Sequence, residues 1–443
     1  MLGSLLQDLN PWWSEPRTRR AQRYPVRRQL QARALAQVLN LDDRRALVIE
    51  GQRQVGKTVL LLQVADDLLA QGWPPGNLTY FDFSDDRIVG ELSAREIVKA
   101  KPANADPNRP RVFLFDEVGR ATNWAAWLKQ TVDRNQYRLL VTDSASSLLR
   151  AGSRESGQGR WDLVRMEGLT FAEFVQLNSP THAAHEAVRA FPGLFERYLA
   201  RGGYPEHALA DSVAEVRERI RADIVDRAIR RDLQTRYDDP RVKDLFLYLV
   251  QHSGGVFDAR KRAQDLGADY RSVDAWNDAL QDTLLIADLP AHALSRSARS
   301  RLRARPKIYA SDHGLIAAFS DLPAPLQDST TRGRAYEAMV FRHLRDYART
   351  QHHQLGYLEG NGRENEVDFV LDTGANRIAL EVTSSQSVAD KPGRLHEAGK
   401  RLKTARLVLV YGGIISEQRA GIHVLPATRF ALDPIQALAE VGS

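Results

Sequence analysis

The stretch ALVIEGQRQVGKT, residues 46–58, carries the clearest structural signal in this chain. Its first five residues form an apolar run of the length of a buried strand. The remainder, GQRQVGKT, fits the pattern G-x-x-x-x-G-K-[ST], and apolar residues at helical spacing follow it. A glycine-rich loop between a strand and a helix turns its N–H groups toward phosphate oxygens, with the positive helix end behind them. The stretch therefore predicts a phosphate-binding loop.

Positions in this loop have expected roles in binding a nucleotide and its metal ion. Lys57 would reach the β- and γ-phosphates, and the Thr58 hydroxyl would bind Mg²⁺. The remaining residues expected to surround the phosphates are Gly51, Gln52, Arg53, Gln54, Val55, Gly56 and Val59. We therefore expect ATP and Mg²⁺ as ligands.

A second motif, FLFDE at 113–117, ends an apolar run with two acids. Because burying carboxylates without partners is costly, such a pair at a strand end indicates a site. We expect Asp116 to hold Mg²⁺ and Glu117 to orient or deprotonate the attacking water. This second carboxylate favours hydrolysis over phosphoryl transfer to a small acceptor.

Two further roles in hydrolysis have candidates after the apolar run at 137–145. Ser144, or Thr142, could contact the γ-phosphate, although either could simply cap the strand end. An arginine commonly stabilises the transition-state charge. Arg160 is our first choice, acting in its own subunit or a neighbouring one, and a solvated surface position is the alternative.

Apolar runs alternate with helical patterns through the first part of the chain, at 46–50, 78–84, 111–117 and 137–145. This alternation predicts an α/β fold, with a parallel sheet covered by helices on both faces. The preceding arm, residues 1–30, is rich in basic and aromatic residues. It could contact phosphate or a neighbour, but packing onto its own core is favoured.

The region 241–325 has helical patterns followed by a hairpin-like stretch, which is the layout of a winged helix-turn-helix. Its wing carries six basic residues and no acid between 295 and 307. These candidate DNA contacts are Arg296, Arg299, Arg301, Arg303, Arg305 and Lys307.

Several motifs in this order resemble a family of bacterial and archaeal AAA-type ATPases. They are NPWW (10–13), GQRQVGKT (51–58), FLFDEV (113–118), NWAAWLK (123–129), TDSASSLL (142–149), RGGYPE (201–206), PKIYASDHGL (306–315), RGRAYE (332–337) and EVDFVL…LEVTSS (366–385). The resemblance implies a P-loop ATPase core, a helical lid, a winged helix and a C-terminal restriction-endonuclease-like domain. The expected ranges are 31–175, 176–240, 241–325 and 326–443. Asp143 stands where the family usually has glycine.

The C-terminal acids suit a metal-dependent nuclease with one residue changed. Asp368 and Glu381 lie on adjacent predicted strands, and Glu337 is the usual third acid of this architecture. These carboxylates would bind Mg²⁺ or Mn²⁺. Thr383 replaces the expected lysine. Three interpretations stay open: an inactive domain that still binds nucleic acid, an active one using Lys391 or Lys400, and acids that are purely structural.

The composition sets limits on the class of protein. The 443 residues contain no cysteine, which excludes disulfides and thiolate zinc sites and fits a reducing cytoplasm. No apolar run approaches a membrane span, and no signal peptide is expected. The net charge of +6 is compatible with a polyanionic partner. We expect a cytoplasmic homo-oligomer that couples ATP to DNA engagement, with an ATP-regulated nuclease or a scaffold for protein partners as alternatives.

Overall fold

The computed structural model places two compact units along the chain, residues 1–168 and residues 169–443, and each is described by itself. The structure describes residues 2–441 except for 144–158, 227, 230–232, 234–236, 293–303, 361–365, 389–391 and 404.

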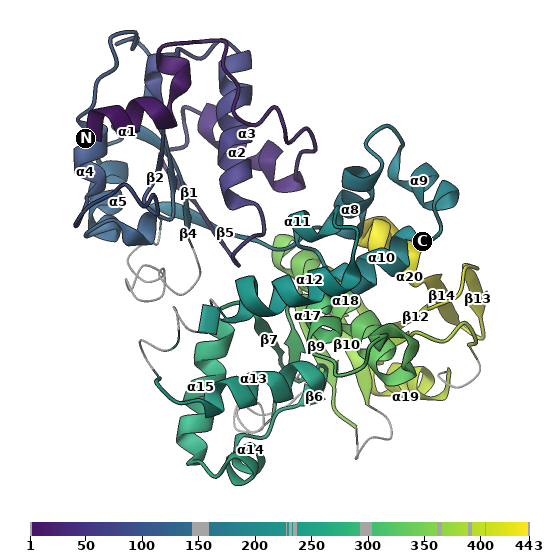
Figure 1. Ribbon diagram of the computed structural model, residues 1–443. Coiled ribbons are helices and arrows are strands. Elements are labelled where there is room, and N and C mark those ends of the chain that lie inside the picture. Colours follow the sequence, from purple (N-terminus) through teal and green to yellow (C-terminus); the bar gives the residue numbers. More distant parts are fainter. Residues whose placement is uncertain are drawn as a thin grey trace. The chain divides into compact units, whose positions relative to one another are not determined.

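The first unit is built on a five-stranded parallel sheet (Figure 1). Its strands are β1 (Ala46–Gly51), β2 (Leu78–Asp82), β3 (Arg111–Asp116), β4 (Tyr137–Asp143) and β5 (Trp161–Met166). They lie in the order β2-β3-β4-β1-β5, so β4 separates the strand before the phosphate loop from the strand that ends in acids. This arrangement confirms the parallel α/β core and brings three strand ends to one edge of the sheet.

Strand β5 was not predicted, because the sequence pattern indicates only four strands. Strand β5 reads WDLVRM, with Asp162 and Arg165 only partly covered and Leu163 exposed. It is an edge strand, so it lacks the continuous apolar run of the buried strands. The pairing of Arg165 with Glu50 of β1, at 2.8 Å, fastens it beside the phosphate loop.

Helices cover both faces of this sheet, with α2 and α3 on one face and α4 and α5 on the other (Figure 1). Their bounds are α2 (Gln29–Leu39), α3 (Lys57–Ala70), α4 (Ala94–Val98) and α5 (Trp124–Asp133). The N-terminal arm, with α1 (Leu2–Leu9), packs onto its own core as favoured from the sequence. The Asn10 side chain exchanges hydrogen bonds with the Tyr80 backbone, and the buried Trp12 indole donates to the Leu78 carbonyl.

The second unit begins with helices and a three-stranded antiparallel sheet. The helices are α8 (Phe171–Asn178), α9 (Ala184–Ala190), α10 (Leu194–Arg201), α11 (Pro205–Ala208), α12 (Val213–Arg219), α13 (Arg241–Gln251), α14 (Ala259–Leu266), α15 (Tyr270–Asp282) and α17 (His313–Ala318). The strands β6 (Gly255–Val256), β7 (Ile286–Leu289) and β8 (Lys307–Ala310) lie in the order β6-β8-β7. The predicted order of helices followed by a hairpin is therefore present between residues 241 and 310.

The rest of this unit is a long helix followed by a six-stranded mixed sheet with its helices. These elements are α18 (Ser329–Thr350), β9 (Gln354–Leu358), β10 (Val367–Asp372), β11 (Arg377–Thr383), α19 (Pro392–Leu402), β12 (Ala405–Tyr411), β13 (Glu417–Arg419), β14 (Ile422–Pro426), α20 (Ala427–Leu432) and α21 (Pro434–Glu440). Strands β9, β10 and β11 are antiparallel neighbours, whereas β12 runs parallel to β11.

The compact units differ from the expected domains in two places. The first unit ends at Gly168 instead of residue 175, because Phe171 and Phe174 of α8 pack against Tyr198 in the second unit. The ranges 176–240, 241–325 and 326–443 then share a single unit. One reason is the backbone of Tyr357 in β9, which exchanges hydrogen bonds with Pro290 and His292 beyond β7.

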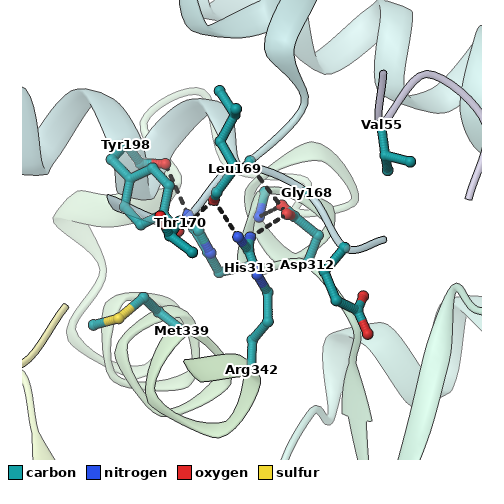
Figure 2. Close-up of polar contacts among 12 residues, drawn as sticks. Val55, Gly168, Leu169, Thr170, Tyr198, Asp312, His313, Met339 and Arg342 are labelled. Carbon is teal, nitrogen blue, oxygen red and sulfur yellow. Dashed lines mark hydrogen bonds and ion pairs between the residues drawn. The ribbon is translucent and has the colours of Figure 1, made fainter. Parts of the chain in front are cut away.

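A buried polar cluster joins several of the sequence motifs inside the second unit (Figure 2). The Asp312 carboxylate accepts hydrogen bonds from the Gly203 and Gly314 N–H groups and pairs with Arg342 of α18 at 2.8 Å. Arg342 also donates to the Leu169 carbonyl, which accepts a second bond from the Tyr198 hydroxyl. This cluster therefore fastens the first residue of the second unit to its long C-terminal helix.

Glycine is required where RGGYPE meets this cluster. Gly202 has a φ of +75°, and a Cβ there would lie 2.2 Å from a carboxylate oxygen of Asp312. A Cβ on Gly203 would lie 2.4 Å from an Arg342 nitrogen. The glycine pair is therefore explained by close approach to the ion pair.

We predict that the second unit loses stability as the pH falls below about 6.5. Burial first, and then Arg342, lower the pKa of His343 to about 3, so the folded protein holds this imidazole neutral. The unfolded chain protonates it near pH 6.5, so its contribution is complete above that pH and falls between pH 6.5 and 3. The loss is about 2 kcal/mol at pH 5.

Urea unfolding at pH 7.5 and pH 5 measures this difference. The control is His343→Leu, which removes the titrating group and should show a smaller pH dependence than the wild type. An equal loss of stability in both proteins would assign the effect to other groups.

Candidate functional site

The phosphate loop lies between β1 and α3, as the motif predicts. Gln54 and Gly56 have positive φ values of 62° and 99°, which reverse the chain within the loop. Gly51 lies so close to β5 that a Cβ would be 2.6 Å from the Met166 carbonyl oxygen. Glycine is therefore needed at 56 because of the positive φ, and at 51 because the backbone of β5 lies too close for a side chain.

Lys57 is 5% exposed, and its ammonium lies inside this loop. It donates to the carbonyls of Gly51 and Gln52, each at 3.0 Å, and lies 3.7 Å from the Glu117 carboxylate. The loop backbone thus holds the ammonium next to the positions that phosphates take in such a loop. Lys57 opens α3 and Glu117 follows β3, and their side chains meet here.

Asp116 ends β3 and is almost completely buried beside the loop. One of its carboxylate oxygens accepts from the Thr58 hydroxyl at 2.5 Å and from the Tyr80 hydroxyl at 3.3 Å, and the other accepts from the Thr142 hydroxyl. Burial raises the pKa of Asp116, although the bonds from Thr142 and Thr58 act to lower it. A carboxylate and a hydroxyl at this distance are oxygen donors of the kind Mg²⁺ binds, so these residues fit the expected ion.

Glu117 follows Asp116 with a φ of 50°, and its carboxylate is partly exposed. The left-handed backbone turns Glu117 away from the strand direction, so its side chain reaches the loop instead of the next strand. Its N–H donates to the Thr142 hydroxyl at 3.4 Å. Thr142 therefore contacts both acids, which makes it the described residue of β4 with the strongest claim to sense the nucleotide.

Of the other two candidates for hydrolysis, the structure describes Arg160, whereas Ser144 lies outside the described residues. Arg160 precedes β5, whose Trp161 is level with Ala46 at the start of β1, whereas the phosphate loop follows the end of β1. Arg160 therefore lies at the opposite edge of the sheet from its own loop, where it pairs with Asp133. With this register, the predicted role of Arg160 would require a neighbouring subunit, and a solvated surface position stays the alternative.

The C-terminal acids gather around a lysine instead of forming an open group. The ammonium of Lys307, in β8, lies 2.7 Å from Glu366 and 3.9 Å from both Glu337 and Asp368. Tyr309, two residues along β8, donates its hydroxyl to Glu337 at 2.6 Å. We call these five residues the Lys307 centre.

Lys307 was expected to contact DNA from the wing, and that prediction is wrong. Its side chain is 2% exposed and points into the protein. Burial acts to lower the pKa of Lys307, but Glu337, Asp368 and Glu366 outweigh burial and hold it above its ordinary range. The ammonium is therefore charged at neutral pH and is not available to a phosphate on the surface.

Glu381 belongs to the same face of the sheet as Asp368. Strands β10 and β11 pair with Phe369 opposite Leu380, and continuing this register by one residue sets Asp368 opposite Glu381. The Val382 N–H donates to Asp368 at 2.9 Å, which supports this placement. The two acids predicted to be neighbours are neighbours, but Glu381 is completely buried.

Of the two lysines proposed to replace the missing one, the structure describes only Lys400. Lys400 of α19 is 77% exposed and pairs with Glu397, while Lys391 lies outside the described residues. Across the part of the chain that the structure describes, no group of three or more His, Asp or Glu side chains is arranged to hold a metal ion. The carboxylates here are arranged around an ammonium.

The other predicted DNA contacts are only partly described. Arg296, Arg299, Arg301 and Arg303 lie outside the described residues, and Arg305 pairs with Asp258 at 2.7 Å. The exposed side of α15 carries Asp274 and Asp278, and Asp282 follows at the same spacing. Burial and these neighbouring acids raise the pKa of Asp278. This acidic helix face would repel a DNA phosphate backbone.

Comparisons with known proteins agree with the nucleotide site. The family model of an AAA domain matches residues 43–175, which contain the phosphate loop and both acids of β3. The first unit is therefore an AAA-type P-loop ATPase core. Models of two domains of unknown function, DUF8612 and DUF4143, match residues 193–326 and 332–430.

Proteins similar to more than half of this chain are found in bacteria. An uncharacterized protein of Haemophilus influenzae is 22% identical over 277 residues, which cover 60% of this chain and 67% of that protein. Uncharacterized proteins of Mycobacterium tuberculosis and Mycobacterium bovis are each 26% identical over 376 residues, covering 83% of this chain and 76% of theirs. The similarity to the mycobacterial proteins thus extends beyond the ATPase core.

Among solved structures, two of Saccharomyces cerevisiae Hsp104 are similar at 13% identity. The complex with casein has a TM-score of 0.30 and the ADP complex 0.34, over 62% and 63% of this chain. The matches span about half of each Hsp104 chain, 51% and 52%. The ATPase assignment rests instead on the AAA match and on the phosphate-loop geometry. Among the described residues, no helix combines the length and the apolar character needed to cross a bilayer.

Proposed function

We propose that this protein hydrolyses Mg·ATP and that its nucleotide state controls DNA engagement by residues 241–310. The observation that supports this coupling is the set of hydrogen bonds made by Arg28, near the end of the N-terminal arm. Its guanidinium donates to the carbonyl of Val55 in the phosphate loop and to those of Glu167 and Gly168. A rearrangement of the loop between ATP and ADP states would therefore be felt at the last residue of the ATPase unit.

The next residue along the chain, Leu169, is held firmly in the second unit. Its carbonyl accepts from Arg342 and Tyr198, and its N–H donates to the Gly203 carbonyl. Adjacent residues are thus fastened to different units, Gly168 to the phosphate loop and Leu169 to the long helix α18. This connection supports a coupling between nucleotide exchange and the second unit.

The order α13, β6, α14, α15, β7, β8 is compatible with the expected winged helix, and this supports the proposal that the segment is the DNA-binding element. Because the exposed side of α15 is acidic, we assign DNA contact to the basic wing, with Arg296, Arg299, Arg301, Arg303 and Arg305, and not to that helix. Contacts of this kind are to phosphate and are strongly salt-dependent.

The order α18, β9, β10, β11, α19, β12 supports a restriction-endonuclease-like domain. We propose that it is a degenerate one, since the expected lysine is Thr383 and the carboxylates are engaged by Lys307. An ATP-regulated, metal-dependent nuclease is the alternative, and a nucleotide-dependent scaffold for protein partners is a further one. For the ATPase itself, Arg160 would act from a neighbouring subunit, which implies a homo-oligomer.

The wing is tested by the triple variant Arg299→Ala/Arg301→Ala/Arg303→Ala. We expect it to weaken duplex DNA binding and to reduce the slope of log affinity against log salt by about 2.7, at roughly 0.9 for each phosphate that is no longer neutralised. Fluorescence anisotropy over a series of salt concentrations, with ADP and with a non-hydrolysable ATP analogue, measures both quantities. An unchanged slope would remove the wing from the DNA interface.

Two further variants separate the role of the wing from those of α15 and Arg28. Asp274→Asn/Asp278→Asn alters the acidic side of α15 and should bind DNA at least as well as the wild type. Arg28→Met should retain DNA binding but lose the difference between the ADP and ATP-analogue states. Absence of DNA affinity at low salt, together with a nucleotide-dependent change of oligomeric state, would instead favour the scaffold.

A further inference from the structure

The Lys307 centre is assembled from segments far apart in the sequence. Lys307 comes from β8 of the winged-helix segment, Glu337 from the middle of α18, and Asp368 from β10. The Lys307 side chain is nearly inaccessible, whereas the side chains of all three acids around it keep some exposure. The lysine therefore lies beneath the acids and the acids cover it.

The residues beside the Lys307 ammonium hold it through a hydrogen bond, a cation–π contact and charge pairing. Glu366 accepts a close, charge-assisted hydrogen bond from Lys307 at 2.7 Å. The ring of Tyr357, in β9, lies 5.3 Å from the ammonium, within the range of a cation–π contact. Tyr309 donates to Glu337, so this carboxylate is oriented by a second residue of β8.

A divalent cation bound by Asp368 and Glu337 would have to share their oxygens with this ammonium. Both carboxylates lie 3.9 Å from the Lys307 nitrogen, so a metal ion between them would be a few ångströms from a fixed positive charge. Repulsion at that distance is strong away from bulk water. The ligand set that the sequence predicts for Mg²⁺ or Mn²⁺ therefore does not fit a metal while Lys307 is present.

We propose that the Lys307 ammonium is the resident cation of this centre and takes the place of the divalent metal ion. The acids then act as an anchor that fastens β8 to α18 and β10, without binding metal or cleaving a phosphodiester. This inference rests on the restriction-endonuclease-like assignment made above. It explains why Thr383 is tolerated, because a centre without a metal-bound water has no use for a lysine on β11.

The inference predicts that removing the ammonium creates a metal site. Lys307→Met keeps much of the length of the side chain but not its charge, and we expect it to gain a Mn²⁺ site that the wild type lacks. Mn²⁺ titration of the nucleotide-free full chain, followed by electron paramagnetic resonance, counts the bound ions. The gain should vanish in Lys307→Met/Asp368→Asn, and Lys400→Met, which removes an exposed lysine, should behave as the wild type.

Asp368→Asn in the otherwise wild-type chain gives a test that does not depend on folding of the Lys307 variant. We expect no change in Mn²⁺ binding, because the wild-type centre holds none. A wild-type Mn²⁺ site that disappears in Asp368→Asn would overturn the proposal and make Lys307 a partner of the metal. Folded Lys307→Met without a gained site would also contradict it.

These results are separable from the ATPase and DNA proposals. Manganese at the phosphate loop is common to every variant and cancels in the comparison. DNA affinity and ATP turnover are measured on the same wild-type protein, so either can fail while the manganese result stands. Plasmid cleavage by the wild type that is lost in Asp368→Asn would refute the resident ammonium and establish the nuclease alternative together.

Discussion

Glu117→Gln is expected to lower the rate of ATP hydrolysis by about 10²–10⁴-fold, the usual contribution of a positioned general base. The substitution keeps the size of the side chain and removes its ability to accept a proton. Glu117 lies 3.7 Å from the Lys57 ammonium, at the mouth of the loop where the γ-phosphate and its attacking water would meet. Because Asp116 and Thr58 are unchanged, we expect nucleotide binding to persist.

Phosphate release measures turnover, and a fluorescent ATP analogue measures binding. The two readouts separate Glu117→Gln from Lys57→Ala, which should lose binding together with turnover because the phosphates lose their cation. Glu218→Gln, at an exposed position of α12, is the matched control and should hydrolyse ATP at the wild-type rate. Wild-type turnover in Glu117→Gln would show that another group activates the water.

Arg342→Met is expected to destabilise the second unit by about 3–5 kcal/mol, because it leaves a buried carboxylate without its partner. Arg342 and Asp312 are 3% and 4% exposed in their side chains. Burial acts to raise the pKa of Asp312, but Arg342 and the N–H groups of Gly314 and Gly203 are among the groups that hold it below its ordinary value. The substitution also removes a donor from the Leu169 carbonyl.

Urea unfolding followed by circular dichroism measures the loss. Arg349→Met is a matched control on the same helix, since Arg349 pairs with Asp346 in an exposed position and should contribute at most about 1 kcal/mol. Arg342→Lys keeps the charge but loses the planar fork, so an intermediate loss is expected. Equal losses for Arg342→Met and Arg349→Met would show that the buried pair is not what stabilises this unit.

The nucleotide site could be predicted from the sequence because its chemistry is local. The spacing of Gly51, Gly56 and Lys57 belongs to one loop, and the acids of β3 directly follow an apolar run. The contribution of Tyr80 could not be predicted in this way. Its hydroxyl reaches Asp116 only because β2 and β3 are neighbours, and strand order is not encoded in any local pattern.

The position of Arg160 could not be predicted either, because it depends on a strand that the sequence pattern does not indicate. Its place after the fourth apolar run made it a candidate for the site of its own subunit or of a neighbouring one, since residues after a parallel strand often reach the ligand edge. The unexpected strand β5 begins at Trp161 and runs parallel to β1, which carries Arg160 to the opposite edge. One additional edge strand was enough to change the candidate's position.

The sequence by itself determined the phosphate loop, its acids, the alternation that makes a parallel sheet, and the adjacency of Asp368 and Glu381. Each depends on residues close in the chain or on the regular geometry of paired strands. Only the tertiary structure decided that Lys307 and Glu337, thirty positions apart, share one ion cluster with β10. A charged side chain looks the same in sequence whether solvent or carboxylates surround it, because its surroundings depend on which segments pack together.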